Sequence, residues 1–332
     1  MKGSAKMKGI NLAIVGATGL VGQTFLKVLE KRNFPINQLY CFASSRSAGK
    51  VIEFKGKEYV VEELTEQSFN REIDLALFSA GGAISKKFAP IAAQKGIRVV
   101  DNSSAWRMDP EIPLIVPEVN ASDLNENHYI IANPNCSTIQ SVVPLKVLHE
   151  AFKIKRIIYS TYQAVSGSGV KGLKDLEEGT SDFYPHQISG NCLPHIDIFL
   201  ENGYTKEEIK MIEETKKILG DQSIQVTSTT VRVPVKYGHC VSMNLQFERD
   251  FTLDQVYTLL QSVDGLVLHG KENPLDYPTP LDVEGQDEVH VGRIRRDFSV
   301  ENGLSLWVVA DNIRKGAATN TVQIAERLLT YL

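Results

Sequence analysis

The chain contains few cysteines, and they do not form a metal-binding pattern. Its 332 residues include only Cys41, Cys136, Cys192 and Cys240, whose spacing matches no set of metal ligands. His239 precedes Cys240 directly, but no second pair accompanies them, and neighbours on a strand point to opposite faces. We therefore predict no metal, and we expect free thiols in a reducing compartment.

The chain also lacks a basic stripe and any apolar stretch near the ~20 residues that a membrane span needs. Hydrophobic residues make up 42%, charged residues 23%, and the net charge is −4, which is typical of soluble globular proteins. The length allows two domains. Neither nucleic acid nor a membrane is an expected partner. The basic start, residues 1–6, is not followed by the apolar core of a signal peptide, so we expect an unprocessed cytoplasmic protein.

A glycine-rich turn lies between a predicted strand and a predicted helix. The apolar run 10–15 ends in Gly16-Ala17-Thr18-Gly19-Leu20-Val21-Gly22, and a helical pattern follows through Lys31. Glycines permit a tight turn and let a phosphate approach the N–H groups at a helix N-terminus. The glycines alone are a weak signal, but their position between strand and helix predicts a dinucleotide site.

The second predicted strand, 39–43, is not followed by the carboxylate that would bind the ribose of NAD. The chain continues with Ser44-Ser45-Arg46-Ser47, and an arginine with hydroxyls suits a 2′-phosphate. This loop predicts NADP, and the alternative is an ordinary solvated loop.

Strands and helices continue to alternate through the first part of the chain. A strand at 75–79 leads to Gly81, a helix to Gln94 and a strand at 97–100. This alternation predicts an α/β fold, a doubly wound parallel sheet of the Rossmann type. The polar run 101–107 follows at a strand's carboxyl end, where such sheets bind ligands.

The second half predicts an α+β domain with a mixed or antiparallel sheet and helices on one face. A helical pattern returns at 313–331, and 180–203 looks irregular. We predict a cofactor domain at 8–132, with helix 313–332 packing back on it, and a catalytic and dimerisation domain at 133–312. The predicted strands of the second domain are 155–163, 223–233, 241–247, 289–296 and 304–310.

The most informative segment surrounds one cysteine. Asn133-Pro134-Asn135-Cys136-Ser137-Thr138 joins a predicted strand to a predicted helix. Pro134 helps to end the strand, and Ser137 and Thr138 are predicted to cap the helix. Cys136 would then lie at the positive end of the helix dipole, which lowers the pKa of a thiol. The alternative is a core cysteine that packs as a small hydrophobic residue.

An activated thiol beside a nicotinamide site suggests the oxidation of an aldehyde. A thiolate adds to the aldehyde carbon, hydride leaves, and a second nucleophile takes up the resulting thioester. Such a site needs a base, an oxyanion donor and anchors for substrate charge.

A set of motifs extends over nearly the whole chain. It comprises the glycine turn, Ser44 to Ser47, Asp101-Asn102-Ser103-Ser104, the cysteine segment, Thr161 to Gly167, Glu207 to Lys210, Arg232-Val233-Pro234, Gly238-His239 and Asp311 to Ala318. Together these motifs resemble those of the aspartate-β-semialdehyde dehydrogenases.

The resemblance implies catalytic roles for three residues. Cys136 would be the nucleophile that becomes the acyl-thioester. His239 would be the acid/base, whose neutral form takes the thiol proton, and Gln163 would orient the substrate. Without the resemblance, His239 would be interpreted as a core or surface histidine and Gln163 as an ordinary strand residue.

Arg232 and His239 are seven residues apart, which on one continuous strand would place them on opposite faces. Pro234 and Gly238 between them favour a turn or bulge, which allows them to converge. The resemblance implies that Arg232 holds the substrate α-carboxylate in a bidentate pair.

Three further charged residues are implied to bind substrate or phosphate. Arg107 and Lys210 resemble the family's phosphate-site cations, and Glu207 would receive the substrate ammonium. Glu207 and Lys210 are three apart on a predicted helix, so the alternative is a surface ion pair worth ~0.2–0.5 kcal/mol.

The predicted cofactor-binding residues lie in the glycine turn and in the serine loop (residues 44–47), and the resemblance implies others. They are Gly16, Thr18, Gly19, Leu20, Val21, Ser44, Arg46, Ser47, Ser79, Gly81, Ser166, Gly167 and Asn312.

The resemblance implies one reaction and one assembly. NADP would oxidise L-aspartate 4-semialdehyde, and phosphate would release 4-aspartyl phosphate, a step before lysine, methionine and threonine synthesis. The family works as a homodimer and includes tetramers. The alternatives are an N-acetyl-γ-glutamyl-phosphate reductase, whose substrate has no ammonium for Glu207, and a non-catalytic NADP-binding protein on the same fold.

Overall fold

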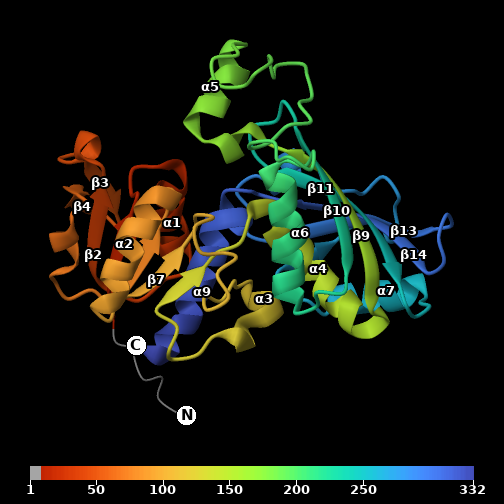
Figure 1. The fold of residues 1–332 in the computed structure, drawn as a ribbon, viewed down its shortest axis with the longest axis horizontal. Coiled ribbons are helices and arrows are strands. Elements are labelled where there is room, and N and C mark those ends of the chain that lie inside the picture. The colour runs from red at the N-terminus through yellow and green to blue at the C-terminus, as the bar shows by residue number, and fades with distance from the viewer. Residues whose placement is uncertain (1–8) are drawn as a thin grey trace. The chain divides into compact units, whose positions relative to one another are not determined.

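The computed structural model describes residues 9–332, which form two compact units (Figure 1). Of the described residues, unit 1 contains 9–117, Ala121–Asn133 and Ala318–Leu332. Unit 2 contains Glu118–Asn120 and Pro134–Ala317.

Unit 1 is built on a six-stranded sheet in the order β5-β2-β1-β6-β7-β8. Every neighbouring pair of strands in this sheet is parallel, as the alternation of strands and helices predicted. The strands are β1 (Ile10–Val15), β2 (Ile36–Ala43), β5 (Glu62–Glu63), β6 (Leu75–Phe78), β7 (Arg98–Asp101) and β8 (Ile130–Ala132).

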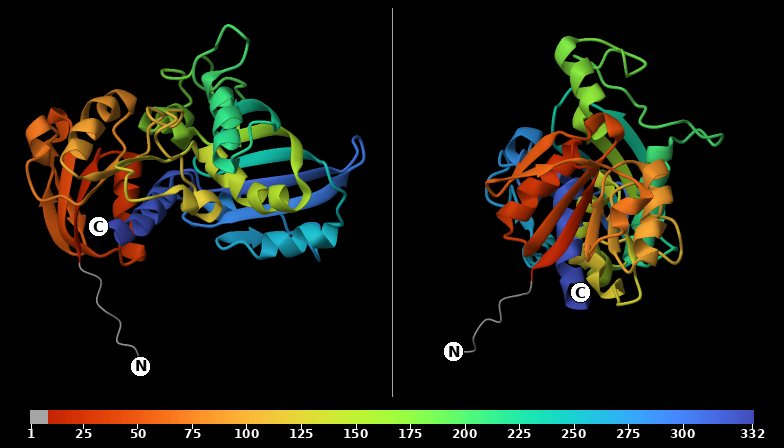
Figure 2. Two further views of the ribbon diagram at one scale, coloured as in Figure 1. Left: turned by 60° about the horizontal axis from the view of Figure 1, so that its bottom comes forward. Right: turned by 90° about the vertical axis from the view of Figure 1, so that its left-hand side faces the viewer.

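Helices cover both faces of this sheet (Figures 1 and 2). Leu12 and Ile14 of β1 belong to a core cluster shared with α1 (Leu20–Lys31) and α9 (Thr319–Leu328). Ala13 and Val15 face the other way, into a cluster shared with α2 (Gly82–Gln94). Because successive strand residues point to opposite faces, the continuous apolar run of β1 serves two layers. The Rossmann-type prediction is confirmed.

A short antiparallel hairpin, β3 (Val51–Phe54) and β4 (Lys57–Val60), was not foreseen. Its two turn residues, Lys55 and Gly56, both have positive φ angles, the conformation of the tightest hairpin turns.

Unit 2 is built on a mixed six-stranded sheet in the order β10-β9-β11-β14-β13-β12. The outer pairs β9–β10 and β12–β13 are parallel, and the inner pairs are antiparallel. The predicted mixed sheet is confirmed. The strands are β9 (Ile154–Gln163), β10 (Gln225–Arg232), β11 (His239–Phe247), β12 (Leu266–Leu268), β13 (Val289–Asp297) and β14 (Gly303–Ala310).

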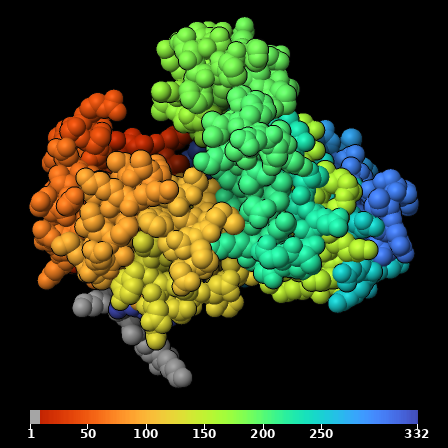
Figure 3. All heavy atoms as spheres, in the orientation of Figure 1, coloured from red at the N-terminus to blue at the C-terminus, as the bar shows by residue number. Residues whose placement is uncertain are grey.

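Three helices pack side by side on one face of this second sheet. They are α4 (Cys136–Phe152), α6 (Lys206–Leu219) and α7 (Leu253–Gln261), and α4 contacts both others. The segment from α5 (Val170–Glu178) to residue 203 protrudes from the body of unit 2 (Figures 1 and 3). After α5 it has almost no regular structure, as predicted. The shorter helices are α3 (Pro117–Asn120) and α8 (Pro280–Val283).

The cap of α4 differs from the prediction. The N-cap is Asn135, whose side-chain oxygen accepts hydrogen bonds from the N–H groups of Ser137 (2.9 Å) and Thr138 (3.3 Å). Ser137 and Thr138 therefore lie in the first turn and do not cap it. Asparagine caps as well as serine, and the preceding Pro134 leaves Asn135 as the first residue with extended backbone and a suitable side chain.

Within the described part of the chain, every helix is too short or too polar to cross a lipid bilayer. Residues 9–332 also contain no cluster of three His, Cys, Asp or Glu side chains suited to a metal ion.

Candidate active site

Unit 1 contains a glycine turn whose geometry requires glycine. Gly16 has a φ of +89°, and a Cβ there would lie 2.2 Å from the carbonyl oxygen of Ser79. A Cβ on Gly22 would lie 2.2 Å from the carbonyl oxygen of Gly16, so this glycine lets α1 approach the turn closely. The N-cap of α1 is Gly19, which has no side chain to cover the first-turn N–H groups. An anion can bind such a helix terminus.

A cavity of about 410 Å³ opens beside this turn. Thr18 Oγ1 donates to Ser47 Oγ at 3.3 Å, which joins the glycine turn to the serine loop. Arg46 and Ser47 lie in the single 3₁₀ turn Ser45–Ser47. The cavity is lined by Val15, Gly16, Thr18, Gly19, Ala43, Ser44, Ser45, Glu63, Leu64, Ser79, Ala80, Ile84 and Phe88.

Five predicted cofactor residues therefore line the cavity: Gly16, Thr18, Gly19, Ser44 and Ser79. The other predicted residues of unit 1 adjoin helix starts. Leu20 and Val21 form the first turn of α1, and Gly81 is the N-cap of α2.

One lining residue was missed. Glu63, on the edge strand β5, pairs in parallel register with Ala43 at the end of β2, and it is one of the residues that line the cavity. No acidic residue directly follows strand β2 along the chain, where Ser44-Ser45-Arg46-Ser47 stand. A neighbouring strand of only two residues supplies one in space, and its pattern is too short to recognise.

Arg107 also lies in unit 1, in the loop after β7, and it is buried. Its Nε donates to the carbonyl oxygen of Asn133 at 2.9 Å and its Nη2 to that of Asn102 at 3.2 Å. The Asn133 side chain donates to Asn102 Oδ1 at 2.6 Å. The preceding Asp101 is fully buried, and this burial raises the pKa of its carboxyl group.

In unit 2, Cys136 is the first residue of α4. Gly316 packs directly against it: a Cβ on Gly316 would lie 2.9 Å from the Cys136 Cβ. Gly316 belongs to a short π-helical turn, Arg314–Ala318, and such turns are frequent at functional sites. Gly316 appeared only as part of a family motif, and nothing in the sequence indicated this contact.

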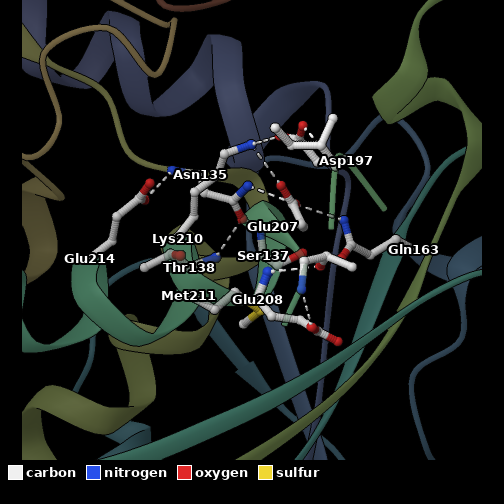
Figure 4. Close-up of polar contacts among 12 residues, drawn as sticks. Asn135, Ser137, Thr138, Gln163, Asp197, Glu207, Glu208, Lys210, Met211 and Glu214 are labelled. Carbon is white, nitrogen blue, oxygen red and sulfur yellow. Dashed lines mark hydrogen bonds and ion pairs between the residues drawn. The ribbon is translucent and has the colours of Figure 1, made fainter. Parts of the chain in front are cut away.

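A polar network from α6 surrounds the start of α4 (Figure 4). The Oε1 atom of Glu207 accepts from Asn135 Nδ2 at 2.8 Å and from Gln163 Nε2 at 3.2 Å. Its Oε2 accepts from Lys210 Nζ at 3.1 Å, and Lys210 also donates to Asp197 Oδ2 at 2.7 Å. The Glu207–Lys210 pair was considered as a surface ion pair, but Glu207 is only 5% exposed.

This network keeps Glu207 and Lys210 charged. Burial acts to raise the pKa of Glu207, but the Lys210 charge and hydrogen bonds from Asn135, Lys210 and Gln163 lower the pKa below its usual value. Burial acts to lower the pKa of Lys210, but Glu207 and Asp197 raise it overall. A buried charge is tolerated only when it is paired. The charges of Glu207, Lys210 and Asp197 therefore depend on one another.

Arg232 and His239 converge although they lie on different strands. β10 ends at Arg232 and β11 begins at His239, so the predicted turn between them is confirmed. A Cβ on Gly167 would lie 3.0 Å from Arg232 Nη1 and 3.3 Å from His239 Nε2. Arg232 Nη1 also donates to the carbonyl oxygen of Ala164 at 2.7 Å. Gly167 therefore leaves room above both side chains.

The ring of His239 is buried and held in one tautomer. Its Nδ1 accepts the Ala164 N–H at 3.0 Å, so the neutral ring carries its proton on Nε2. Burial, aided by the Arg232 charge, lowers the pKa of His239 well below 6.5. Nε2 is buried and has no hydrogen-bond partner among residues 9–332. The neutral ring therefore has no acceptor nitrogen left, which argues against the predicted role of taking the thiol proton and favours a donor role.

Gln140 ties the cysteine helix to the histidine strand. It lies one turn after Cys136 on α4, and its Nε2 donates to the carbonyl oxygens of His239 (3.0 Å) and Val308 (3.2 Å). Gln140 was not predicted from the sequence, because a glutamine inside an apolar helix carries no functional signal.

Two predicted cofactor residues of unit 2, Ser166 and Asn312, contact each other. Asn312 Nδ2 donates to Ser166 Oγ at 3.0 Å. Asn312 Oδ1 accepts the Gly238 N–H at 3.0 Å, which fixes the turn before His239.

A glycine turn on a Rossmann-type sheet, together with a cysteine at a helix start in a mixed-sheet unit, defines a two-domain dehydrogenase class. Models of two families match the chain. The NAD binding domain of semialdehyde dehydrogenases matches residues 11–127, and their dimerisation domain matches residues 145–315.

Similar proteins identify one family within this class. The aspartate-semialdehyde dehydrogenase of Aquifex aeolicus is 54% identical, covering 97% of this chain and 98% of the relative. The structure of aspartate semialdehyde dehydrogenase II from Vibrio cholerae complexed with ASA is 47% identical, with a TM-score of 0.92 over 97% of this chain and 99% of that one. The Candida albicans enzyme with NADP is 27% identical, with a TM-score of 0.77 over 96% and 98% of the two chains. The chain belongs to the aspartate-semialdehyde dehydrogenase family.

Proposed function

We propose that this chain catalyses the reversible, NADP-dependent conversion of L-aspartate 4-semialdehyde and phosphate to 4-aspartyl phosphate, through a thioester on Cys136. The observation that carries the proposal is the position of Cys136: it begins α4, beside the buried network of Asn135, Glu207 and Gln163. The relative complexed with ASA supports the substrate class. In this family the step belongs to amino-acid biosynthesis, ahead of lysine, methionine and threonine. We expect it in the cytoplasm, where its four free thiols stay reduced.

The cofactor site fits a dinucleotide phosphate. Gly19 leaves the first-turn N–H groups of α1 uncovered, and the serine loop at 44–47 offers hydroxyls and Arg46 for a 2′-phosphate. The relative with NADP supports this choice. Glu63, which also lines the cavity, disfavours NADP relative to NAD, because its negative charge repels the 2′-phosphate. We therefore propose NADP as the preferred cofactor and not the exclusive one.

The proposed chemistry begins with the thiolate of Cys136 at the positive end of the α4 dipole. The thiolate sulfur adds to the aldehyde carbon, and the carbonyl oxygen takes the negative charge. The Nε2–H of neutral His239 donates a hydrogen bond to that oxygen. NADP, when bound, supplies the hydride acceptor. Once hydride has left the tetrahedral carbon for the cofactor, the carbonyl would re-form as a thioester. An oxygen of hydrogen phosphate would then add to the thioester carbon, and the Cys136 thiolate would leave. The proton of hydrogen phosphate would pass to solvent, so His239 is not needed as its acceptor.

The charged side chains of the site are proposed to hold the substrate. Arg232 presents a planar fork for the α-carboxylate, and its buried Nε has no partner among the described residues. Glu207 and Gln163 orient the amino-acid end, and Lys210 and Arg107 attract phosphate. Ser166, Gly167 and Asn312 line the nicotinamide.

The chain is proposed to work as a homodimer, and tetramers remain an outcome to test. The sheet face of unit 2 away from α4 and α6 carries Tyr162, which is 41% exposed, and Trp307, whose ring lies 5.4 Å from it. A cavity of about 370 Å³ adjoins Trp307 on this face. A matching surface of a second copy would cover these rings, as expected of a dimerisation domain.

The decisive experiment follows NADPH formation from L-aspartate 4-semialdehyde and phosphate, with N-acetyl-glutamate semialdehyde in parallel. We expect turnover of the first substrate, little of the second, and a large loss of turnover in Cys136→Ser. Turnover of neither substrate by the unmodified enzyme would contradict the proposal. Full activity of Cys136→Ser would contradict the thioester.

A further inference from the structure

We propose that Glu214 is a positioning residue for the nucleophile: from α6 it holds the backbone of Asn135, and through Asn135 it fixes where Cys136 begins helix α4. The inference rests on the proposed nucleophilic role of Cys136. No motif in the sequence pointed to Glu214.

The contact itself is short and buried. The Oε2 atom of Glu214 accepts the backbone N–H of Asn135 at 2.6 Å, and Glu214 is only 1% exposed. Asn135 directly precedes Cys136, and Pro134 before it has no N–H to donate. The Asn135 N–H is therefore the one backbone donor in the two residues before Cys136. A carboxylate oxygen accepts such a bond more strongly than a neutral oxygen does.

Asn135 is held from α6 at two points (Figure 4). Glu214 accepts its backbone N–H, and Glu207 accepts its side-chain Nδ2 at 2.8 Å. The two glutamates are seven residues apart, which places them on one face of α6, two turns from each other. The same Asn135 caps α4 through its Oδ1. The position of the first turn of α4, and of Cys136 in it, is therefore set from α6.

Gly316 also packs against this turn, because a Cβ built on it would lie 2.9 Å from the Cys136 Cβ. Cys136 therefore has little room to shift toward Gly316 without meeting backbone. Loss of the Glu214 acceptor would leave a buried N–H unpaired, and the turn would move to satisfy it. Displacements of about 1 Å in a catalytic group can reduce rates about 100-fold.

A buried glutamate could also serve stability alone, and α6 provides a matched control. Glu208 is 8% exposed, and it accepts backbone N–H groups from Thr205 (2.7 Å) and Thr230 (3.0 Å). It resembles Glu214 in type, helix and kind of bond, but neither of these partners belongs to the cysteine segment 133–138. Of these two glutamates, only Glu214 should therefore affect the position of Cys136.

The experiment compares Glu214→Met, Glu214→Gln and Glu208→Met in the full chain. For each variant it measures the iodoacetamide alkylation rate of Cys136 by peptide mass spectrometry, kcat and KM for the semialdehyde and for NADP, and Tm. We expect Glu214→Met to change the alkylation rate and to lower kcat about 10- to 100-fold, with the KM for NADP unchanged. Glu214→Gln keeps an acceptor oxygen at the same reach and should restore most of both values. Glu208→Met should lower Tm and leave both rates within about twofold of the unmodified enzyme.

Three outcomes would overturn the proposal. They are an unchanged alkylation rate and kcat in Glu214→Met, a loss in Glu214→Gln equal to that in Glu214→Met, or an equal loss in Glu208→Met. If Glu214→Met does not fold, Glu214→Asp tests the same point, because a carboxylate one methylene shorter must pull Asn135 toward α6. A Cys136 alkylation rate in Glu214→Asp equal to that of the unmodified enzyme then overturns it. Absence of turnover by the unmodified enzyme would instead contradict the proposed function, and the alkylation rates would still report on Glu214.

Discussion

At the scale of single residues, His239 shows how burial selects a chemical role. The ring is fully buried, and Arg232 lies close to it. Both effects disfavour the imidazolium, so the ring is a neutral donor at neutral pH. A histidine on a mobile loop would titrate near 6.5 and exchange roles. Here the backbone N–H of Ala164 fixes which nitrogen carries the proton.

This buried ring predicts a pH dependence of stability. Because the folded pKa of His239 is lowered well below 6.5, the unfolded chain binds more protons between that pKa and about 6.5. The free energy of unfolding should therefore fall as pH falls through this window, by up to about 1.4 kcal/mol per pH unit. His239→Gln should remove this part of the slope. Urea unfolding at a series of pH values measures the free energy of unfolding of the unmodified protein and of His239→Gln. Parallel plots of this free energy against pH would contradict the prediction.

Gly316→Ala tests the contact against Cys136. The new Cβ would lie 2.9 Å from the Cys136 Cβ, and overpacking of this kind costs about 1–3 kcal/mol. We expect a lower Tm and a loss of kcat of about tenfold or more, since the thiol must move. The control is Gly82→Ala, where the nearest atom to the new Cβ is 3.9 Å away. A kcat unchanged by Gly316→Ala would show that the turn can relax.

At the scale of elements, prediction from sequence succeeded where the pattern is long. The alternation of apolar strands and helices in unit 1 and the Val- and Thr-rich strands of unit 2 gave the correct sheet types. It failed for short pieces such as β5 and the β3–β4 hairpin, because two to four residues show no periodicity. The cap of α4 was misplaced by two or three residues because Asn135, Ser137 and Thr138 are all good caps.

The residues of the candidate site also divide into those with a sequence signal and those without one. Cys136 was singled out by its motif, and His239 and Arg232 by the family resemblance, and their roles stay predictions. Glu214 and Gln140 were missed because each acts through a backbone atom far away in sequence, Asn135 N–H and His239 C=O. Residue-by-residue patterns contain no signal for such pairings. They appear only when elements pack together.

The pairing of β2 with β5 predicts how the cofactor is selected. Arg46→Ala should weaken NADP binding about tenfold, the effect of losing one charge-assisted hydrogen bond of ~1.5 kcal/mol, and leave NAD binding unchanged. Glu63→Gln should act in the opposite sense and strengthen NADP relative to NAD, because it removes a like charge from the cavity wall. Fluorescence titration gives the Kd values. Lys50→Ala, another exposed cation of the same loop, is the control. Equal losses for NADP and NAD in Arg46→Ala would contradict the 2′-phosphate role.

At the scale of the whole molecule, the residues proposed for cofactor binding and those proposed for catalysis fall largely in different units. Unit 1 contains the glycine turn and its cavity, and unit 2 contains Cys136, the α6 network and His239. The segment 180–203, which sequence alone could not interpret, contacts the proposed substrate-binding residues of unit 2. Leu193 pairs with Arg232 through two backbone hydrogen bonds, and Asp197 binds Lys210. This protruding segment thus supports two proposed substrate-binding residues.

The open sheet face of unit 2 predicts the assembly of the enzyme. Tyr162 is 41% exposed and lies against Trp307, and exposed aromatic pairs are typical of interface centres. Tyr162→Arg places a charge where a second copy should pack, so we expect dimers to dissociate at micromolar concentrations. Sedimentation velocity measures this change. Phe298→Arg is the control, because Phe298 is 94% exposed and lies beyond the end of β13, outside the strands of the sheet. A dimer that withstands Tyr162→Arg, or one that Phe298→Arg dissociates equally well, would place the interface elsewhere on unit 2, because a charge buried without a partner cannot be accommodated at an interface centre.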